Sequence, residues 1–431
     1  MIKISEHSGY SENDVKELEE SVCELLSDGY FKKEFHREKD TQLCFSIQHV
    51  EGIKYKIYSS YMIGVDWVVK NKLPIYVQPK LNTEATEVDY LKMLFEATED
   101  PENLKHLKGL YEIDFKAPLI KIEQNQDRLT PLLLLEFLQL IKQIVRKGLK
   151  KSYYKVTQNL NSRVKGKLLV SATVKQNHTK NKGLYQVCQF DEFGYNSVEN
   201  RILKKTLLFV QAALNQLKGV TTKEIKTVFQ YVFPAFNQVS DQVDLREIKT
   251  IKSNPMFKEY SHALRIAGLI LKKYGYNISK AGSRVVETPP FWIDMSKLFE
   301  LYVFKKLKEV FPNRGEIIYH KKFDYLESDY LLQSRDGRYK MVIDAKYKPR
   351  YVDNQINHDD GRQVSGYARL KKIRNELNIE NKETVDALII YSNQKSEHTE
   401  FNSDTLLEIE DRRYFRLFKY GIQLPVITIN Q

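Results

Sequence analysis

Residues 329–346 read DYLLQSRDGRYKMVIDAK, and this stretch decides how the C-terminal third of the chain is expected to fold. Asp336-Gly337 is a residue pair typical of a tight hairpin turn with positive φ. The flanking segments 329–333 and 339–346 are therefore expected to pair as antiparallel strands. Side chains alternate along a strand, so Asp344 and Lys346 should project from the same face.

This hairpin also carries a chemical pattern. Two carboxylates and one ammonium meet at the same end of it if Asp329 starts the first strand. Carboxylate oxygens suit Mg²⁺, which can hold a scissile phosphate and lower the pKa of bound water, and a lysine can orient that water or stabilise developing charge. The pattern indicates a metal-dependent phosphodiesterase. The alternative is a surface hairpin whose acid and lysine are solvated or paired.

Two neighbouring segments favour the phosphodiesterase interpretation. Residues 294–311 are expected to form a helix that is apolar around most of its circumference, and Glu300 lies within it. A carboxylate there needs a partner, because burial of an unpaired charge is costly. Downstream, Gln363 and Tyr367 stand four residues apart in a predicted helix over 360–377, so they share one face. The alternative for this pair is a polar cap and a packing residue.

The helix glutamate, Asp329, the Asp344-Ala345-Lys346 triplet and the following Q-x-x-x-Y together resemble the PD-(D/E)xK nuclease superfamily. Within that superfamily the chain looks like the McrC family, the nuclease subunits of McrBC-type modification-dependent restriction systems. MSKLFELYV at 295–303 and VIDAKYK at 342–348 carry most of this resemblance. LPIYVQPKL at 73–81, RVKGKL at 163–168 and NSVENRILK at 196–204 extend it over most of residues 60–370.

The resemblance implies a Mg²⁺-dependent DNA endonuclease. Asp329 and Asp344 would bind the metal, with Glu300 as a further metal or supporting carboxylate. Lys346 would position the attacking water or steady the phosphorus, and Gln363 and Tyr367 would brace the site or contact the phosphate backbone. Ser328 stands where the superfamily has proline, so Asp324 and Glu327 are alternatives to Asp329 as the first ligand.

The resemblance also implies a partner. In the McrC family a separate AAA+ GTPase ring recognises and translocates modified DNA, while the nuclease subunit inserts its N-terminal part into the ring and stimulates GTP hydrolysis. The chain itself has no G-x-x-x-x-G-K-[ST] loop for binding nucleotide. We therefore expect an McrB-like AAA+ GTPase ring and double-stranded DNA as its partners.

The formal net charge of +12 is unevenly distributed. Residues 137–190 contain no Asp or Glu but twelve Lys and Arg, a number equal to the whole surplus. Interleaved tyrosines and amides make a surface for the phosphate backbone a reasonable interpretation. The candidate DNA-binding residues are Lys150, Lys151, Arg163, Lys165 and Lys167. A solvated face or contact with an acidic partner remains the alternative.

Composition indicates a folded protein, since 42% of the 431 residues are hydrophobic and 12% are aromatic. No apolar run approaches the roughly 20 residues that span a membrane, and the first residues lack the apolar core of a signal peptide. The three cysteines, Cys23, Cys44 and Cys188, show no disulfide or zinc spacing. We expect no membrane contact and a cytoplasmic location.

The expected fold class is mixed α+β in three parts. Residues 1–125 should form an N-terminal mixed α/β partner-binding region, 126–285 a basic and mainly helical middle region, and 286–431 a PD-(D/E)xK restriction-endonuclease-like domain. Strands are predicted over 42–49, 54–60 and 74–78, helices over 12–27, 132–151, 198–218, 222–233 and 254–274, and a linker over 275–290.

Two other functions fit parts of the sequence. The first is a catalytically silent adaptor that only activates a partner NTPase, although an intact D...D-x-K argues against it. The second is a stand-alone repair or RNA nuclease without a ring partner. The modified base, the cleavage pattern and the stoichiometry are not encoded in any recognisable motif.

Overall fold

The computed structural model describes residues 1–11, 30–36, 41–50, 53–81, 86–100, 102–103, 106–107, 109–114, 116–123, 127, 129–216, 223–244, 258–274, 285–323, 326–347, 356–379, 383–394 and 401–428. The predicted helix over 12–27, Cys23 and the alternative ligand Asp324 lie outside these residues. Helices make up 36% and strands 35% of the structure, which confirms the mixed α+β fold class.

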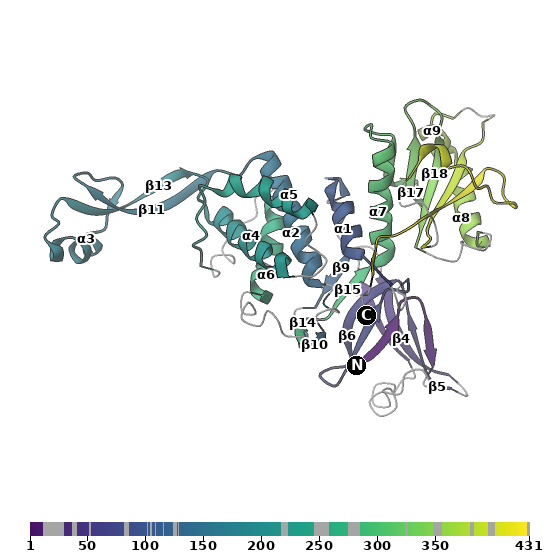
Figure 1. Ribbon diagram of the computed structural model, residues 1–431, viewed down its shortest axis with the longest axis horizontal. Coiled ribbons are helices and arrows are strands. Elements are labelled where there is room, and N and C mark those ends of the chain that lie inside the picture. The colour runs from purple at the N-terminus through teal and green to yellow at the C-terminus, as the bar shows by residue number, and fades with distance from the viewer. Residues whose placement is uncertain are drawn as a thin grey trace. The chain divides into compact units, whose positions relative to one another are not determined.

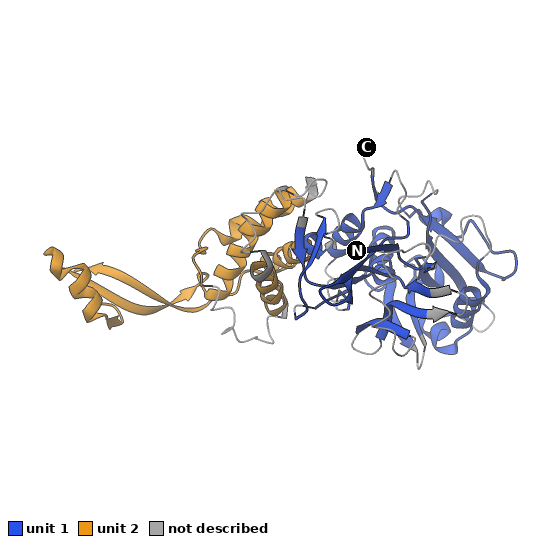
Figure 2. Cartoon of the chain, turned by 90° about the horizontal axis from the view of Figure 1, so that it is seen from below, with its two compact units in different colours: residues 1–132, 283–431 blue, residues 133–282 orange. Residues whose placement is uncertain are grey.

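The chain forms two compact units (Figure 2). The first combines residues 1–132 with residues 283–431, and the second consists of residues 133–282. The boundaries expected from sequence at 125 and 285 stay a prediction about independently folding parts. Among the described helices, none has the length and apolar character needed to cross a membrane.

A five-stranded sheet in the first unit has the order β1-β7-β6-β15-β9. Its strands are β1 (Ile2–Ser5), β7 (Leu73–Gln78), β6 (Met62–Val69), β15 (Phe291–Asp294) and β9 (Tyr111–Ile113). β1 and β7 are parallel, and β15 pairs antiparallel with both β6 and β9. A strand from the C-terminal part of the chain therefore lies inside a sheet built otherwise from the first 113 residues.

A second sheet packs its apolar side chains into the same core. Its order is β2-β5-β4-β3, with β2 (Gly9–Ser11), β5 (Ile53–Ser59), β4 (Thr41–Val50) and β3 (Tyr30–His36). Phe45 and Ile57 from this sheet join Ile75, Val77 and Trp292 of the five-stranded sheet in one buried cluster. The strands predicted over 42–49, 54–60 and 74–78 are confirmed as β4, β5 and β7.

Shorter elements complete this part of the first unit. They are β8 (Thr86–Val88), α1 (Tyr90–Glu99), β10 (Ile120–Glu123), β14 (Val285–Thr288) and β21 (Val426–Thr428). β10 pairs with β14 and β8 pairs with β21. The linker predicted over 275–290 is thus wrong for β14, because Val285–Thr288 finds an antiparallel partner far away in sequence; residues 275–284 lie outside the described residues.

The C-terminal sheet, of which Figure 1 labels β17 and β18, has the order β16-β17-β18-β19-β20. Its strands are β16 (Ile317–Phe323), β17 (Leu326–Gln333), β18 (Lys340–Lys346), β19 (Asp386–Ser392) and β20 (Leu417–Ile422). β16, β17 and β18 pair antiparallel, whereas β18, β19 and β20 are parallel. Helix α7 (Met295–Val310) packs on β16 and β18, and α8 (His358–Ala368) packs on β18 and β19.

The hairpin predicted around Asp336-Gly337 is confirmed. Tyr330 pairs with Ile343 and Gln333 with Lys340, and Gly337 adopts a φ of 72° in the turn. One detail differs from the prediction, because β17 begins at Leu326 and Asp329 lies inside it. Pairing with β16 extends the strand toward its N-terminus.

The helix predicted over 294–311 is α7, and the side chain of Asp294 caps it by accepting the N–H of Lys297 at 3.0 Å. The helix predicted over 360–377 is instead two helices, α8 and α9 (Lys371–Glu376). Leu370 between them has an extended backbone, and it packs with Ile373 and Leu377 against the sheet. Apolar packing after the break therefore turns the chain.

The second unit joins helices to a long β-ribbon. Its elements are α2 (Leu129–Lys147, whose first turn belongs to the first unit), β11 (Ser152–Asn161), β12 (Lys167–Leu168), α3 (Val170–Gln176), β13 (Tyr185–Gly194), α4 (Val198–Gln216), α5 (Lys223–Val232) and α6 (Lys258–Tyr274). Short 3₁₀ helices are His178–Lys180 and Phe233–Phe236 here, and Ser403–Thr405 in the first unit. The predicted helix over 132–151 ends early, at Lys147, because Gly148 follows with a φ of 89°.

The β-ribbon consists of β11 and β13, which pair antiparallel along all ten residues of each, with α3 near the far end (Figure 1). β12 adds two residues to the edge of β13. The helices predicted over 198–218, 222–233 and 254–274 correspond to α4, α5 and α6 within the described residues. Cys44 and Cys188 are buried free thiols, as expected.

Candidate functional site

The hairpin brings Asp329 next to Asp344. Continuing the pairing register by one residue places the two opposite each other, and Asp329 Oδ2 accepts the N–H of Ala345 at 2.8 Å. Burial, followed by the charges of Asp344 and Glu300, raises the pKa of Asp329 well above its ordinary value. These carboxylates are thus close enough to repel one another.

Lys346 completes the predicted triplet. Its Nζ lies 2.8 Å from Asp344 Oδ2 and donates to Gln363 Oε1 at 3.1 Å. Gln363 Nε2 in turn donates to the Tyr367 hydroxyl at 2.9 Å. The structure therefore brings Asp344, Lys346, Gln363 and Tyr367 into one chain of polar contacts.

The protonation states of Lys346 and Asp344 follow from the charges around them. Burial lowers the pKa of Lys346, but Asp344, Asp329 and Asp360 outweigh burial and raise it above its ordinary value. Lys346 is therefore an ammonium at neutral pH. Burial raises the pKa of Asp344, and although Lys346 opposes this, Asp360 and Glu300 add to it.

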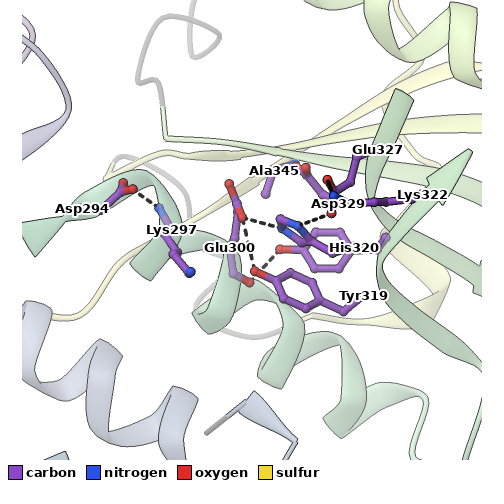
Figure 3. Close-up of polar contacts among 10 residues, drawn as sticks. Asp294, Lys297, Glu300, Tyr319, His320, Lys322, Glu327, Asp329 and Ala345 are labelled. Atoms are coloured by element: carbon purple, nitrogen blue, oxygen red, sulfur yellow. Dashed lines mark hydrogen bonds and ion pairs between the residues drawn. The ribbon is translucent and has the colours of Figure 1, made fainter. Parts of the chain in front are cut away.

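Glu300 reaches the same region from α7 (Figure 3). His320 Nε2 lies 3.0 Å from Glu300 Oε2, and the Tyr319 hydroxyl donates to the same oxygen at 3.3 Å. On its other side, His320 Nδ1 lies 3.0 Å from Glu327 Oε1. Burial lowers the pKa of His320, but its contacts with Glu300 and Glu327 raise it overall. The partner that Glu300 was expected to need is therefore His320.

Three of these residues could share a metal ion. One potential ligand atom from each of Glu300, His320 and Asp329 lies within 4.8 Å of the others. Asp344 Oδ2 is buried beside them and makes no aligned hydrogen bond with any described residue, despite its ion-pair contact with Lys346. Carboxylate oxygens suit Mg²⁺ and Mn²⁺, whereas an imidazole nitrogen is a ligand more typical of Zn²⁺ or Fe²⁺. The donor set fits a divalent cation that would offset the surplus negative charge.

Comparison with known proteins identifies a family. The family model described as McrBC 5-methylcytosine restriction system component matches residues 62–377. The chain belongs to this family. No curated protein sequence matches it significantly.

Solved structures from Thermococcus gammatolerans are similar to this McrBC component. One is a half-complex of McrB AAA+ hexamers with bound McrC, at 15% identity and a TM-score of 0.40, covering 98% of this chain and 94% of that one. A second is the McrBC complex, at 16% identity and a TM-score of 0.29, covering 73% and 89% respectively.

Sequence reasoning missed His320, Tyr319 and Asp360. His320 has a left-handed backbone with a φ of 50°, and it comes near Glu300 through the packing of α7 on β16. Asp360 is buried in the first turn of α8, where its charge acts on Asp344. None of the three stands in a recognisable motif. The alternative ligand Glu327 contacts His320 and Lys322 at the edge of the cluster.

The predicted DNA-binding residues all lie in the second unit, in different surroundings. Lys150 is paired with Glu199 at 2.8 Å, and only 16% of its side chain is exposed. Lys151 lies over the ring of Tyr195, and Lys165 over the ring of Phe190. Arg163, Lys165 and Lys167 are exposed in the segment that runs beside β13, where Lys167 pairs with Gln189 midway along the ribbon and Lys165 lies 3.7 Å from Glu192. Those three remain the residues of the set best suited to meet a phosphate backbone.

Proposed function

We propose that this McrBC component is a Mg²⁺-dependent endodeoxyribonuclease of the PD-(D/E)xK type that hydrolyses DNA phosphodiester bonds in the cytoplasm. The observation that carries the proposal is the convergence of Asp329, Asp344 and Glu300, with the ammonium of Lys346 beside the two aspartates. Such crowding raises the pKa of buried carboxylates and is typical of sites that bind cations or perform catalysis.

Each residue of the site has a distinct role in this proposal. Asp329, Asp344 and Glu300 would hold the metal, with His320 as a further donor. When bound, Mg²⁺ supplies polarisation of the scissile phosphate and a lower pKa for its bound water. Lys346 is protonated, so it would donate hydrogen bonds to the water or to a phosphate oxygen and would not accept a proton. Gln363 and Tyr367 would fix the direction of the Lys346 side chain.

We also propose that the chain stimulates a partner AAA+ GTPase. Membership of a restriction-system family and the surface of the β-ribbon support this. Several large apolar side chains on the ribbon and α3 are exposed: Tyr153, Val164, Leu168, Val170, Val174, Leu184 and Phe193. Clustered exposed apolar side chains with neighbouring cations are typical of a partner-binding surface.

The test is cleavage of double-stranded DNA containing 5-methylcytosine by the chain with an McrB-like GTPase, GTP and Mg²⁺. We expect the wild-type complex to cut and complexes with Asp344→Ala or Lys346→Ala to be inactive, while all three stimulate GTP hydrolysis equally. GTPase stimulation without cleavage by the wild type would favour the silent adaptor. Cleavage that needs no partner would favour the stand-alone nuclease.

A further inference from the structure

Lys80 connects the N-terminal sheet to the end of the strand that carries Lys346. It is the penultimate residue of the LPIYVQPKL segment, two residues after β7 ends. Its Nζ donates to the backbone oxygen of Tyr347 at 2.6 Å. The same ammonium lies 4.0 Å from the ring centre of Tyr347 and 4.4 Å from that of Tyr61. Tyr347 is the residue directly after Lys346.

The position of Lys80 is itself fixed by buried groups. Glu6 is fully buried, and its Oε1 accepts the backbone N–H of Lys80 at 3.1 Å. The N–H of Glu6 donates to the backbone oxygen of Gln78 at 2.9 Å, which prolongs the pairing of β1 with β7. Tyr61 is held by His7, whose ring stacks on it at 4.4 Å. The ammonium therefore extends from a rigid base, between two aromatic faces.

Tyr347 also contacts the other side of the site. Its side chain is 2% exposed, and its ring centre lies 5.8 Å from that of Phe299 on α7. Phe299 directly precedes Glu300. Tyr347 thus follows one proposed site residue, Lys346, and packs on the residue that precedes another, Glu300. Lys80 contacts both the ring and the backbone oxygen of Tyr347.

We propose that Lys80 is a positioning residue for the nuclease site, acting through Tyr347 on Lys346 and Glu300. The inference rests on the proposed nuclease function. A cation between two aromatic rings is attracted to both, and its hydrogen bond to a carbonyl adds a fixed direction. Displacement of a site residue by about 1 Å can lower a reaction rate by on the order of 100-fold. The N-terminal sheet would thereby set the geometry of a site whose motif lies more than 240 residues later.

The experiment compares Lys80→Met with Lys70→Met in the full chain, assayed with its GTPase partner. Lys70 is an exposed residue in the turn between β6 and β7 and serves as the matched control. Lys80→Met should lower the single-turnover cleavage rate by about 10- to 100-fold. DNA affinity and GTPase stimulation should match those of Lys70→Met. Amide exchange should become faster in a peptide covering 341–347 and stay unchanged in α4.

A second variant keeps the inference testable if Lys80→Met fails to fold. Lys80→Arg retains a cation that can stack and donate, so it should keep more cleavage activity than Lys80→Met. Equal cleavage rates for Lys80→Met and Lys70→Met, with Asp344→Ala inactive in the same assay, would overturn the positioning role alone. Full activity of Asp344→Ala would instead overturn the nuclease assignment.

Discussion

The base of the β-ribbon and the candidate metal centre both contain buried polar side chains. The two regions differ in how those side chains find hydrogen-bond partners and opposite charges. At the ribbon base, Asn200 Nδ2 donates to the backbone oxygens of Lys150 and Tyr195 at 2.9 and 2.8 Å, shortly before β11 and directly after β13. The Tyr260 hydroxyl donates to Asn200 Oδ1 at 2.9 Å and accepts the N–H of Lys150 at 2.7 Å. One cation there, Lys150, meets one anion, Glu199.

At the metal centre the balance is negative. Asp329, Asp344 and Glu300 act on one another, Lys346 lies beside the two aspartates, and Asp344 Oδ2 makes no aligned hydrogen bond with the described residues. A network whose donors and acceptors are matched stabilises a fold, whereas crowded like charges oppose it. The comparison teaches that charge balance, more than burial, separates the network at the ribbon base from the candidate metal centre.

The sharpest way to break this comparison is Asp329→Asn, which keeps the shape and removes one charge. Cleavage should fall by about three orders of magnitude, because a proposed metal ligand becomes a poor one. The melting temperature in metal-free buffer should stay equal or rise, because the change relieves repulsion. Cleavage assays and thermal unfolding with and without Mg²⁺ measure both effects.

The matched control for Asp329→Asn is Asp359→Asn, an exposed carboxylate in the first turn of α8. It should change neither the cleavage rate nor the melting temperature. A clear loss of stability in metal-free Asp329→Asn would contradict the charge argument and assign Asp329 to the fold.

At the ribbon base we expect the opposite pattern from Tyr260→Phe. Loss of the hydroxyl leaves Asn200 Oδ1 and the N–H of Lys150 without this partner, at a cost of about 1–3 kcal/mol. The second unit should therefore melt a few degrees lower, since each kcal/mol is worth roughly 2–4 °C at this size. Tyr153→Phe on the exposed part of the ribbon is the control. Equal melting of the two variants would show that the network adds no stability.

The basic residues of the second unit are also expected to have two different roles, in DNA binding and in stability. Replacing exposed Lys165 and Lys167 with Gln should flatten the salt dependence of DNA binding by up to about one unit of slope for each lost phosphate contact. Lys150→Gln should leave the slope unchanged and lower stability instead, because Lys150 is paired with Glu199. Titrations of DNA binding at several salt concentrations distinguish these outcomes. An unchanged slope in the double variant would assign this surface of the ribbon to the protein partner.

The smallest expected effect is the pH dependence of the Lys150–Glu199 pair. Burial raises the pKa of Glu199, but the hydrogen bond from Lys150 helps to lower it overall below the ordinary value of 4.5. The pair therefore stabilises the fold above that ordinary pKa, and this contribution is lost as the pH falls through the lower pKa of the folded state. Glu199→Gln should melt lower than the wild type at pH 7, and the difference should disappear in acid. A difference that persists in acid would point to packing.

The sequence predicted those parts of the site that local patterns encode. The Asp336-Gly337 turn specified the hairpin, and the four-residue spacing placed Gln363 with Tyr367. His320 could not be predicted, because its approach to Glu300 requires the packing of α7 on β16. The pairing of Lys150, a predicted DNA-binding residue, with Glu199 could not be predicted for the same reason, since Glu199 is 49 residues away. Local spacing sets turns and faces, whereas long-range pairing decides which charges meet.

Gly64 has a consequence for how the protein is made. A Cβ at this position would lie 2.0 Å from the backbone oxygen of Phe291, so β15 approaches β6 as closely as only glycine permits. During synthesis β6 therefore lacks its neighbour β15 until the ribosome has made the whole second unit. At 5–20 residues per second this delay is on the order of ten seconds or more. Throughout that time an apolar strand keeps one edge open, and a chaperone bound there would protect it.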